Sequence, residues 1–119
     1  MSKYDYVIVG AGSAGCVLAN RLSQDPSNEV LLIEAGGSDR RFFIQMPIGY
    51  GVTYHQKAVN WMYMTEPSPD ADNKPSYWPR GKVMGGSSSI NAMVYVRGNP
   101  RDFDQWSEAG NPGWSYSDV

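Results

Sequence analysis

Three glycines spaced as Gly10-x-Gly12-x-x-Gly15 constrain the fold of this 119-residue chain more than any other feature. They follow a run of β-branched and aromatic residues at 4–9, which predicts a buried strand. After them, residues 16–24 keep an apolar face and predict a helix of roughly three turns. In such a turn the first glycine allows the sharp bend, the second lets the backbone approach a pyrophosphate, and the third lets the helix pack on the strand. The pattern therefore predicts a dinucleotide-binding turn.

A second apolar run ends at an acidic residue. Residues 30–33 predict another strand, and Glu34 follows it, 19 residues after Gly15. Strand, turn, helix and strand in this order predict an α/β, Rossmann-like βαβ unit at 4–37 with two parallel strands. A carboxylate at Glu34 accepts hydrogen bonds from both ribose hydroxyls and repels a 2′-phosphate, which argues against NADP. The motif alone leaves FAD and NAD both open.

The middle of the chain is less regular. Residues 38–54 show no clean period and predict an irregular loop with a short helix. Residues 60–65 have strand composition and, with 76–78, predict a loose hairpin within the region 38–78. Towards the end, residues 101–108 predict one amphipathic helix. We therefore expect irregular structure to separate the βαβ unit from the last helix.

A second glycine-rich turn lies within residues 79–98. Gly85 and Gly86 precede Ser87 and Ser88, and we expect these serines to cap a helix that follows. Paired glycines before a helix start form an anion site, because their backbone N–H groups face the ligand. The nearby Arg80 and Lys82 add positive charge, so this turn predicts a second contact with a phosphate-containing ligand.

Composition excludes several functions. Ten Lys and Arg against twelve Asp and Glu give a net charge of −2, so we expect no nucleic-acid partner. The single cysteine, Cys16, excludes an internal disulfide and a zinc site built of cysteines, and we expect no metal. The apolar runs are far shorter than the ~20 residues that span a bilayer. We expect a cytoplasmic chain with no transmembrane segment, and peripheral association with the inner membrane stays open.

Five segments together resemble the glucose–methanol–choline (GMC) oxidoreductases, a family of FAD-dependent alcohol oxidases and dehydrogenases. The resemblance covers nearly the whole chain and is greatest to the choline dehydrogenase and aliphatic alcohol dehydrogenase branch. It is carried by YVIVGAGSAGCVLANRL at 6–22, LIEAGG at 32–37, NW at 60–61, YWPRG at 77–81 and RGKVMGGSSSINAMVYVRG at 80–98. The resemblance implies an FAD-binding fold of the Rossmann type.

The resemblance also implies a role for each matching position. The first turn would hold the pyrophosphate, the acid after the second strand would hold the adenosine ribose, and the second turn would line the cofactor path to the flavin ring. These groups are Gly10, Gly12, Ser13, Ala14 and Gly15 for the pyrophosphate; Glu34 and Ala35 for the ribose; Trp61 for the adenine end; Arg80, Val83, Gly85 and Ser87 for the path; and Asn91, Ala92, Met93 and Val94 for the pyrophosphate and flavin. Some relatives bind FAD covalently through a histidine just before this asparagine, where this chain has Ile90. The resemblance therefore implies non-covalent FAD.

The implied reaction is oxidation of a primary alcohol or choline to the aldehyde, with hydride transfer to N5 of the flavin. The family's base is a histidine in its C-terminal part, and the only histidine here, His55, lies far from that region. We therefore expect no catalytic residue in 1–119, no substrate domain, and an N-terminal fragment of an FAD-binding domain. The partner is a small-molecule alcohol, and the electron acceptor stays open among a quinone, another carrier and oxygen.

Two alternatives remain at this point. The chain taken literally is a nucleotide-binding fragment without catalysis, because the implied base is missing. An NAD-dependent Rossmann dehydrogenase shares the first glycine turn and the acid. The second glycine turn argues against that enzyme class, since NAD-dependent dehydrogenases have no need of it.

Overall fold

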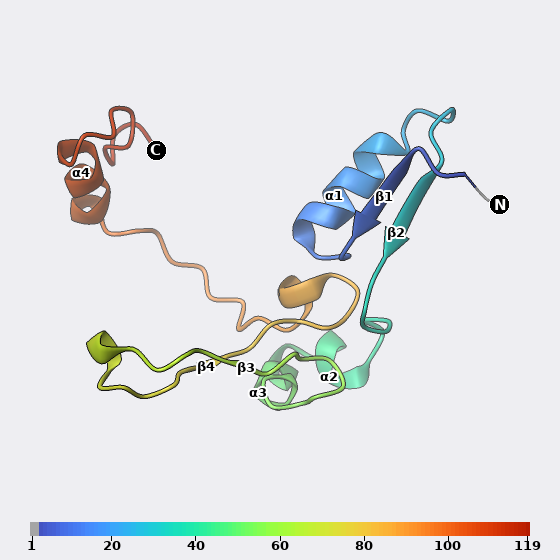
Figure 1. The fold of residues 1–119 in the computed structure, drawn as a ribbon, viewed down its shortest axis with the longest axis horizontal. Helices are drawn as coiled ribbons and strands as arrows, with labels where there is room; N and C mark the ends of the chain where they lie inside the picture. The colour runs from blue at the N-terminus through green and yellow to red at the C-terminus, as the bar shows by residue number, and fades with distance from the viewer. Residues whose placement is uncertain (1–2) are drawn as a thin grey trace.

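The computed structural model describes residues 3–119 and begins with a βαβ unit (Figure 1). Strand β1, Tyr6–Val9, leads into helix α1, Ser13–Leu22, and strand β2, Val30–Ile33, returns beside β1. The two strands are parallel, with Tyr6 opposite Val30 and Val9 opposite Ile33. The predicted unit is therefore confirmed, and its helix begins inside the glycine turn.

The strands of this unit are less buried than the sequence predicts. Val9 is 83% exposed and Val7 is 56% exposed. Within residues 3–119, β1 pairs only with β2, and α1 is the helix that packs against the pair. The prediction of a buried strand is wrong for this chain, because a Rossmann strand becomes buried only when further strands and helices cover its remaining edge and face.

Residues 38–54, for which the sequence predicts an irregular loop with one short helix, contain three short helical turns. They are the single-turn helices α2, Phe42–Gln45, and α3, Tyr50–Thr53, joined by the 3-10 turn η1, Pro47–Gly49. Together they lie below β2 in Figure 1. A small core forms here, where the buried side chains of Val59, Val83 and Ile90 pack with the partly buried Ile44.

The predicted hairpin is confirmed, although its strands are shorter than the apolar run. Strand β3, Tyr63–Met64, pairs antiparallel with β4, Tyr77–Trp78, and the 3-10 turn η2, Pro69–Ala71, lies at the far end of the hairpin. The pairing continues as one isolated bridge between Asn60 and Gly81. The hairpin therefore leads directly into the second glycine turn, which lies beside the βαβ unit.

The second glycine turn does not start a regular helix, so the predicted capping role of its serines is wrong. Gly86–Ser89 form a single 3-10 turn, η3, and Ser87 and Ser88 lie inside it. Gly85 occupies the cap position with a φ of +86°, a left-handed conformation that glycine adopts easily and serine does not. The serine hydroxyls instead hold the turn itself: Ser88 Oγ donates to the Gly85 carbonyl at 2.6 Å, and Ser89 Oγ donates to the Met84 carbonyl at 2.7 Å.

An extended connector and a separate helix complete the chain. Residues 91–99 are exposed and lead to helix α4, Pro100–Glu108, which Asn99 caps by accepting the Arg101 N–H at 3.1 Å. The helix lies apart from the βαβ unit (Figure 1), and the radius of gyration is 18.8 Å, against about 13.5 Å for a compact domain of this length. Among residues 3–119, none of the helices has the length and hydropathy to cross a membrane.

Candidate functional site

The first glycine turn has an open side and a packed side. Gly10 has φ +97°, and its N–H donates to the Ile33 carbonyl at 2.7 Å. A Cβ at Gly15 would overlap the Gly10 carbonyl oxygen, so this glycine lets α1 pack on the turn. A Cβ at Gly12 would meet nothing within 4 Å. The space beside Gly12 faces the start of α1, where the backbone N–H groups of the first turn favour an anion.

Glu34 ties the end of β2 to this turn. One carboxylate oxygen, Oε2, accepts the Ala11 N–H at 2.8 Å, and Oε1 accepts the Gly36 N–H at 2.9 Å. Each oxygen has lone pairs left for a second donor. The side chain is half-buried, so the acid both fixes the turn and offers acceptors to a ligand beside it.

The second glycine turn docks directly on the first. The Gly85 N–H donates to the Ala11 carbonyl at 2.7 Å, and a Cβ at Gly86 would come within 2.9 Å of the Gly12 Cα. The hydroxyls of Ser13 and Ser88 are 3.2 Å apart, in hydrogen-bond contact. These contacts bring two motifs that are far apart in the sequence to one place.

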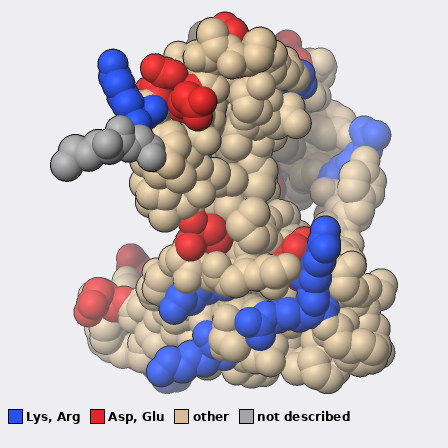
Figure 2. Space-filling model, turned by 90° about the vertical axis from the view of Figure 1, so that its right-hand side faces the viewer, with Lys and Arg blue, Asp and Glu red and all other residues tan. Residues whose placement is uncertain are grey.

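An open cavity of about 500 Å³ lies beside the docked turns, at the carboxyl ends of the two parallel strands. Parallel α/β sheets bind ligands at this end of their strands. Seven of the sixteen predicted site residues line the cavity, namely Gly10, Gly12, Glu34, Ala35, Trp61, Arg80 and Ser87. Figure 2 shows Lys and Arg side chains gathered on the lower half of the view, below the βαβ unit.

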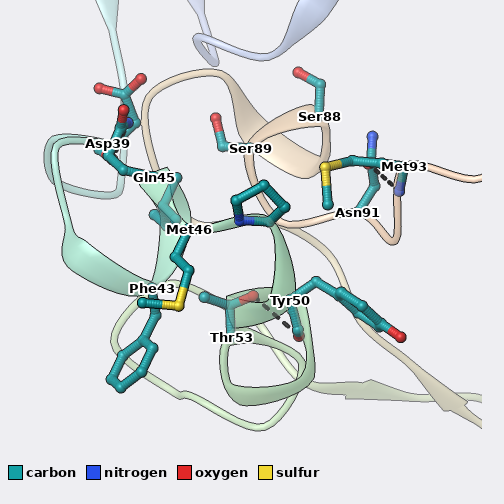
Figure 3. Close-up of a pocket in the computed structure, with 12 residues that line it drawn as sticks. Asp39, Phe43, Gln45, Met46, Tyr50, Thr53, Ser88, Ser89, Asn91 and Met93 are labelled. Atoms are coloured by element: carbon teal, nitrogen blue, oxygen red, sulfur yellow. Dashed lines mark hydrogen bonds between the residues drawn. The ribbon is translucent and has the colours of Figure 1, made fainter.

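Three more predicted residues lie at two neighbouring cavities. A cavity of about 220 Å³ is lined by Asn91 and Met93 on one side and by α2 and α3 on the other (Figure 3). A cavity of about 310 Å³ is lined by Asn91 and Ala92 together with Tyr50 and Tyr54 of the α3 region. The Asn91 side chain accepts the Met93 N–H at 2.8 Å and so bends the chain between these cavities.

The structure does not bring the other six predicted residues to these cavities. Val83 is fully buried in the core, and Gly15 is buried where α1 packs on the turn. Gly85 contributes its N–H to the contact between the two turns. Val94 is 74% exposed in the connector, and Ser13 and Ala14 lie exposed at the start of α1. His55, which we expect to have no catalytic role, stacks on the ring of Tyr77 at 5.9 Å.

Sequence reasoning missed five residues that line the largest cavity. They are Val9, Ile33, Tyr63, Gly81 and Gly86. Val9 and Ile33 end the two parallel strands, a position from which they could have been predicted. Gly86 touches Gly12 only because the chain folds back over a long distance, and no local pattern carries that information.

The buried Asn60 has a structural role that the sequence did not predict. Its side-chain amide donates to the Tyr54 carbonyl at 2.9 Å, and its carbonyl oxygen accepts the N–H groups of Met62 at 2.9 Å and Arg80 at 3.0 Å. The residue is 1% exposed. Asn60 therefore joins α3, the hairpin and the segment that leads into the second glycine turn.

Comparisons with known proteins point to a single family. A model of the GMC oxidoreductase family matches residues 4–119. The chain is 56% identical over 113 residues to the oxygen-dependent choline dehydrogenase of Vibrio vulnificus strain YJ016, covering 95% of this chain and 20% of the relative. It is 53% identical over 113 residues to the alcohol dehydrogenase [acceptor] of Pseudomonas putida, with the same coverage of both chains. The chain spans about a fifth of the length of these relatives.

A solved structure supports the same match. Pyridoxine 4-oxidase from Mesorbium loti superimposes with a TM-score of 0.73 and 41% sequence identity. The superposition covers 98% of this chain and 23% of that protein. The sequence and the fold therefore agree on one family.

Proposed function

The chain belongs to the GMC oxidoreductase family, and we propose that it forms the FAD-binding part at the N-terminus of a longer alcohol-oxidising enzyme. FAD is the cofactor of the family, so the NAD-dependent alternative is wrong. One observation carries the proposal for this chain: the two glycine turns meet at the bond from the Gly85 N–H to the Ala11 carbonyl, beside a cavity that contains Glu34.

The residues around this cavity fit a dinucleotide. Its volume of about 500 Å³ falls within the ~300–1,000 Å³ that is usual for ligand pockets. Gly12 leaves room for a phosphate group, and Glu34 supplies acceptors for ribose hydroxyls. The first turn would hold the pyrophosphate, Glu34 and Ala35 the adenosine ribose, and Trp61 the adenine.

The second glycine turn and the connector would hold the remaining part of FAD. Arg80 and Ser87 line both the largest cavity and the one beside Asn91, so the two cavities are neighbours and would together form the path of the cofactor. Along this path Asn91, Ala92 and Met93 would position the flavin half. Ile90 is 8% exposed and has no nucleophilic atom, which supports non-covalent binding.

The bound FAD would accept hydride from the carbon of an alcohol, and this chain would bind and orient the cofactor. We propose a primary alcohol or choline as the substrate, oxidised to the aldehyde. The support is the similarity to a choline dehydrogenase and to an alcohol dehydrogenase. The electron acceptor stays open among a quinone, another carrier and oxygen.

Titration of the full-length enzyme with FAD tests this function. Gly12 has φ −74° and open space for a side chain, so Gly12→Val folds but blocks the phosphate position. We expect the wild type to bind FAD and Gly12→Val to lose at least about tenfold in affinity, equal to about 1.4 kcal/mol. Gly51→Ala is the control, because its Cβ also meets nothing within 4 Å and it lies in α3. Equal FAD affinity in wild type and Gly12→Val would overturn the proposal.

A further inference from the structure

A lysine that does not line the largest cavity contacts the ring of a tryptophan that does. The ammonium nitrogen of Lys82 lies 4.6 Å from the centroid of the Trp61 ring. The Trp61 ring is nearly parallel to the Tyr63 ring, with centroids 5.8 Å apart and planes at 5°. Trp61 and Tyr63 line the cavity that contains Glu34, whereas Lys82 does not.

The backbone fixes this lysine opposite the tryptophan. The Lys82 N–H donates to the Val59 carbonyl at 2.8 Å, and the Trp61 N–H donates to the Arg80 carbonyl at 2.8 Å. Both segments are part of the antiparallel contact that includes Asn60 and Gly81. On its other side, the Lys82 carbonyl packs so closely against Gly36 that a Cβ there would overlap it. Lys82 is therefore anchored between the hairpin and the residues that follow Glu34.

We propose that Lys82 is a positioning residue that fixes the Trp61–Tyr63 wall for the adenine of FAD. The inference rests on the proposed function, in which Glu34 holds the ribose to which adenine is attached. Aromatic rings bind nucleobases by stacking. A cation over one ring of the pair restricts its side-chain motion before the ligand arrives, which lowers the entropic cost of binding. The cation acts through the indole ring and does not touch the ligand.

A direct charge effect makes a different prediction from this positioning role. A lysine that attracts the pyrophosphate would strengthen the binding of any diphosphate, with or without a base. A lysine that positions Trp61 strengthens the binding of ligands that contain adenine and leaves inorganic pyrophosphate unaffected. Arg80, which lines the cavity itself, is the residue placed for the direct effect.

The experiment compares ADP with inorganic pyrophosphate. Apoprotein prepared from the full-length enzyme is titrated with each probe by calorimetry, for the wild type, Lys82→Met and Lys82→Arg. We expect Lys82→Met to weaken ADP binding about two- to fivefold, the usual range for an exposed cation–π contact, and to leave pyrophosphate binding unchanged. Lys82→Arg keeps a cation over the indole ring, so we expect ADP affinity close to that of the wild type.

Lys74→Met is the matched control. It removes the same charge from an exposed residue between η2 and β4, whose only ion pair within residues 3–119 is with the exposed Asp72 at 3.9 Å. We expect it to leave the binding of both probes unchanged. Unchanged ADP affinity in Lys82→Met, or an equal loss for ADP and pyrophosphate, would overturn the positioning role alone. Failure of the wild type to bind ADP or FAD would overturn the proposed function and this inference with it.

Discussion

The backbone N–H of Gly85 donates a hydrogen bond of 2.7 Å to the carbonyl oxygen of Ala11, and this bond joins the two glycine turns of the chain. Beside it, Gly86 packs on Gly12 with φ +60°. The cavity that we assign to the dinucleotide exists because these two turns meet. The shape of the cavity therefore depends on the Gly85–Ala11 hydrogen bond and on the packing of Gly86 against Gly12.

Gly86→Ala tests the contact between the turns. A Cβ there would come within 2.9 Å of the Gly12 Cα, and the backbone has a positive φ. We expect a loss of about 1–2 kcal/mol in the free energy of unfolding of the full-length enzyme, from the left-handed conformation alone. The FAD dissociation constant should rise as well, because the turns separate. Denaturant unfolding and FAD titration measure the two effects, and Gly51→Ala should show neither.

Glu34→Gln tests the acid at the end of β2. The two carboxylate oxygens accept two backbone N–H groups. The amide of Gln has one acceptor oxygen, so it keeps one of these bonds and turns its NH₂ group towards the other N–H donor. We expect about tenfold weaker binding of FAD, since hydrogen bonds to a charged group contribute about 1.5–3 kcal/mol. Binding of ADP that carries a 2′-phosphate should fall less than binding of ADP, because the repulsion is removed.

The control for this substitution is Glu29→Gln, which removes the same charge from an exposed position just before β2. If both variants weaken FAD binding equally, the loss of affinity is caused by the change in net charge. The role of Glu34 as a ribose acceptor is then contradicted. A drop in 2′-phosphate binding that matches the drop in ADP binding would contradict the repulsion argument.

Asn60→Ala tests the buried amide that joins α3 to the hairpin. The substitution leaves the N–H groups of Met62 and Arg80 without their acceptor. Because an unsatisfied buried group costs about 1–3 kcal/mol, we expect a loss of about 2–4 kcal/mol in stability. Thermal unfolding of the enzyme measures it. Asn20→Ala, at an exposed position of α1, should change stability far less, and a similar melting temperature for both variants would contradict the assigned role of Asn60.

Acid precipitation tests non-covalent FAD. Ile90 packs in the core with Val59 and Val83 and offers no atom that could bond to the flavin. We expect the yellow flavin to stay in the supernatant when the holoenzyme is precipitated. Flavin that remains with the protein pellet would show a covalent bond and would contradict this prediction.

Local patterns predicted the local structure well. The apolar run before Gly10 and the one before Glu34 became β1 and β2, because strand and helix periodicities are visible within a few residues. The amphipathic pattern at 101–108 became α4, which starts one residue earlier. The same local signals placed Gly12 and Glu34 in one cavity, since a βαβ unit brings the turn and the end of the second strand together.

Contacts between distant segments were beyond these patterns. Ser87 and Ser88 have the composition of helix caps, but the positive φ of Gly85 and Gly86 turns the chain towards Ala11 and Gly12, so a 3-10 turn forms instead. Val83 lies in a motif that resembles a cofactor site, yet its side chain fills the core. Lys82 and Trp61 are paired only by the antiparallel contact of their segments, which no spacing in the sequence reveals.

The meeting of the two glycine turns also sets an order of events during synthesis. Gly12 and Glu34 are translated early. Gly85 and Gly86, which form the second turn, are translated much later. Closing such a long loop is slow compared with forming the βαβ unit next to it. A nascent chain that has emerged up to the end of β4 therefore carries eight of the twelve residues that line the cavity. The remaining four, Arg80, Gly81, Gly86 and Ser87, come last, so the cavity that we assign to the dinucleotide is complete only after the second turn has been translated.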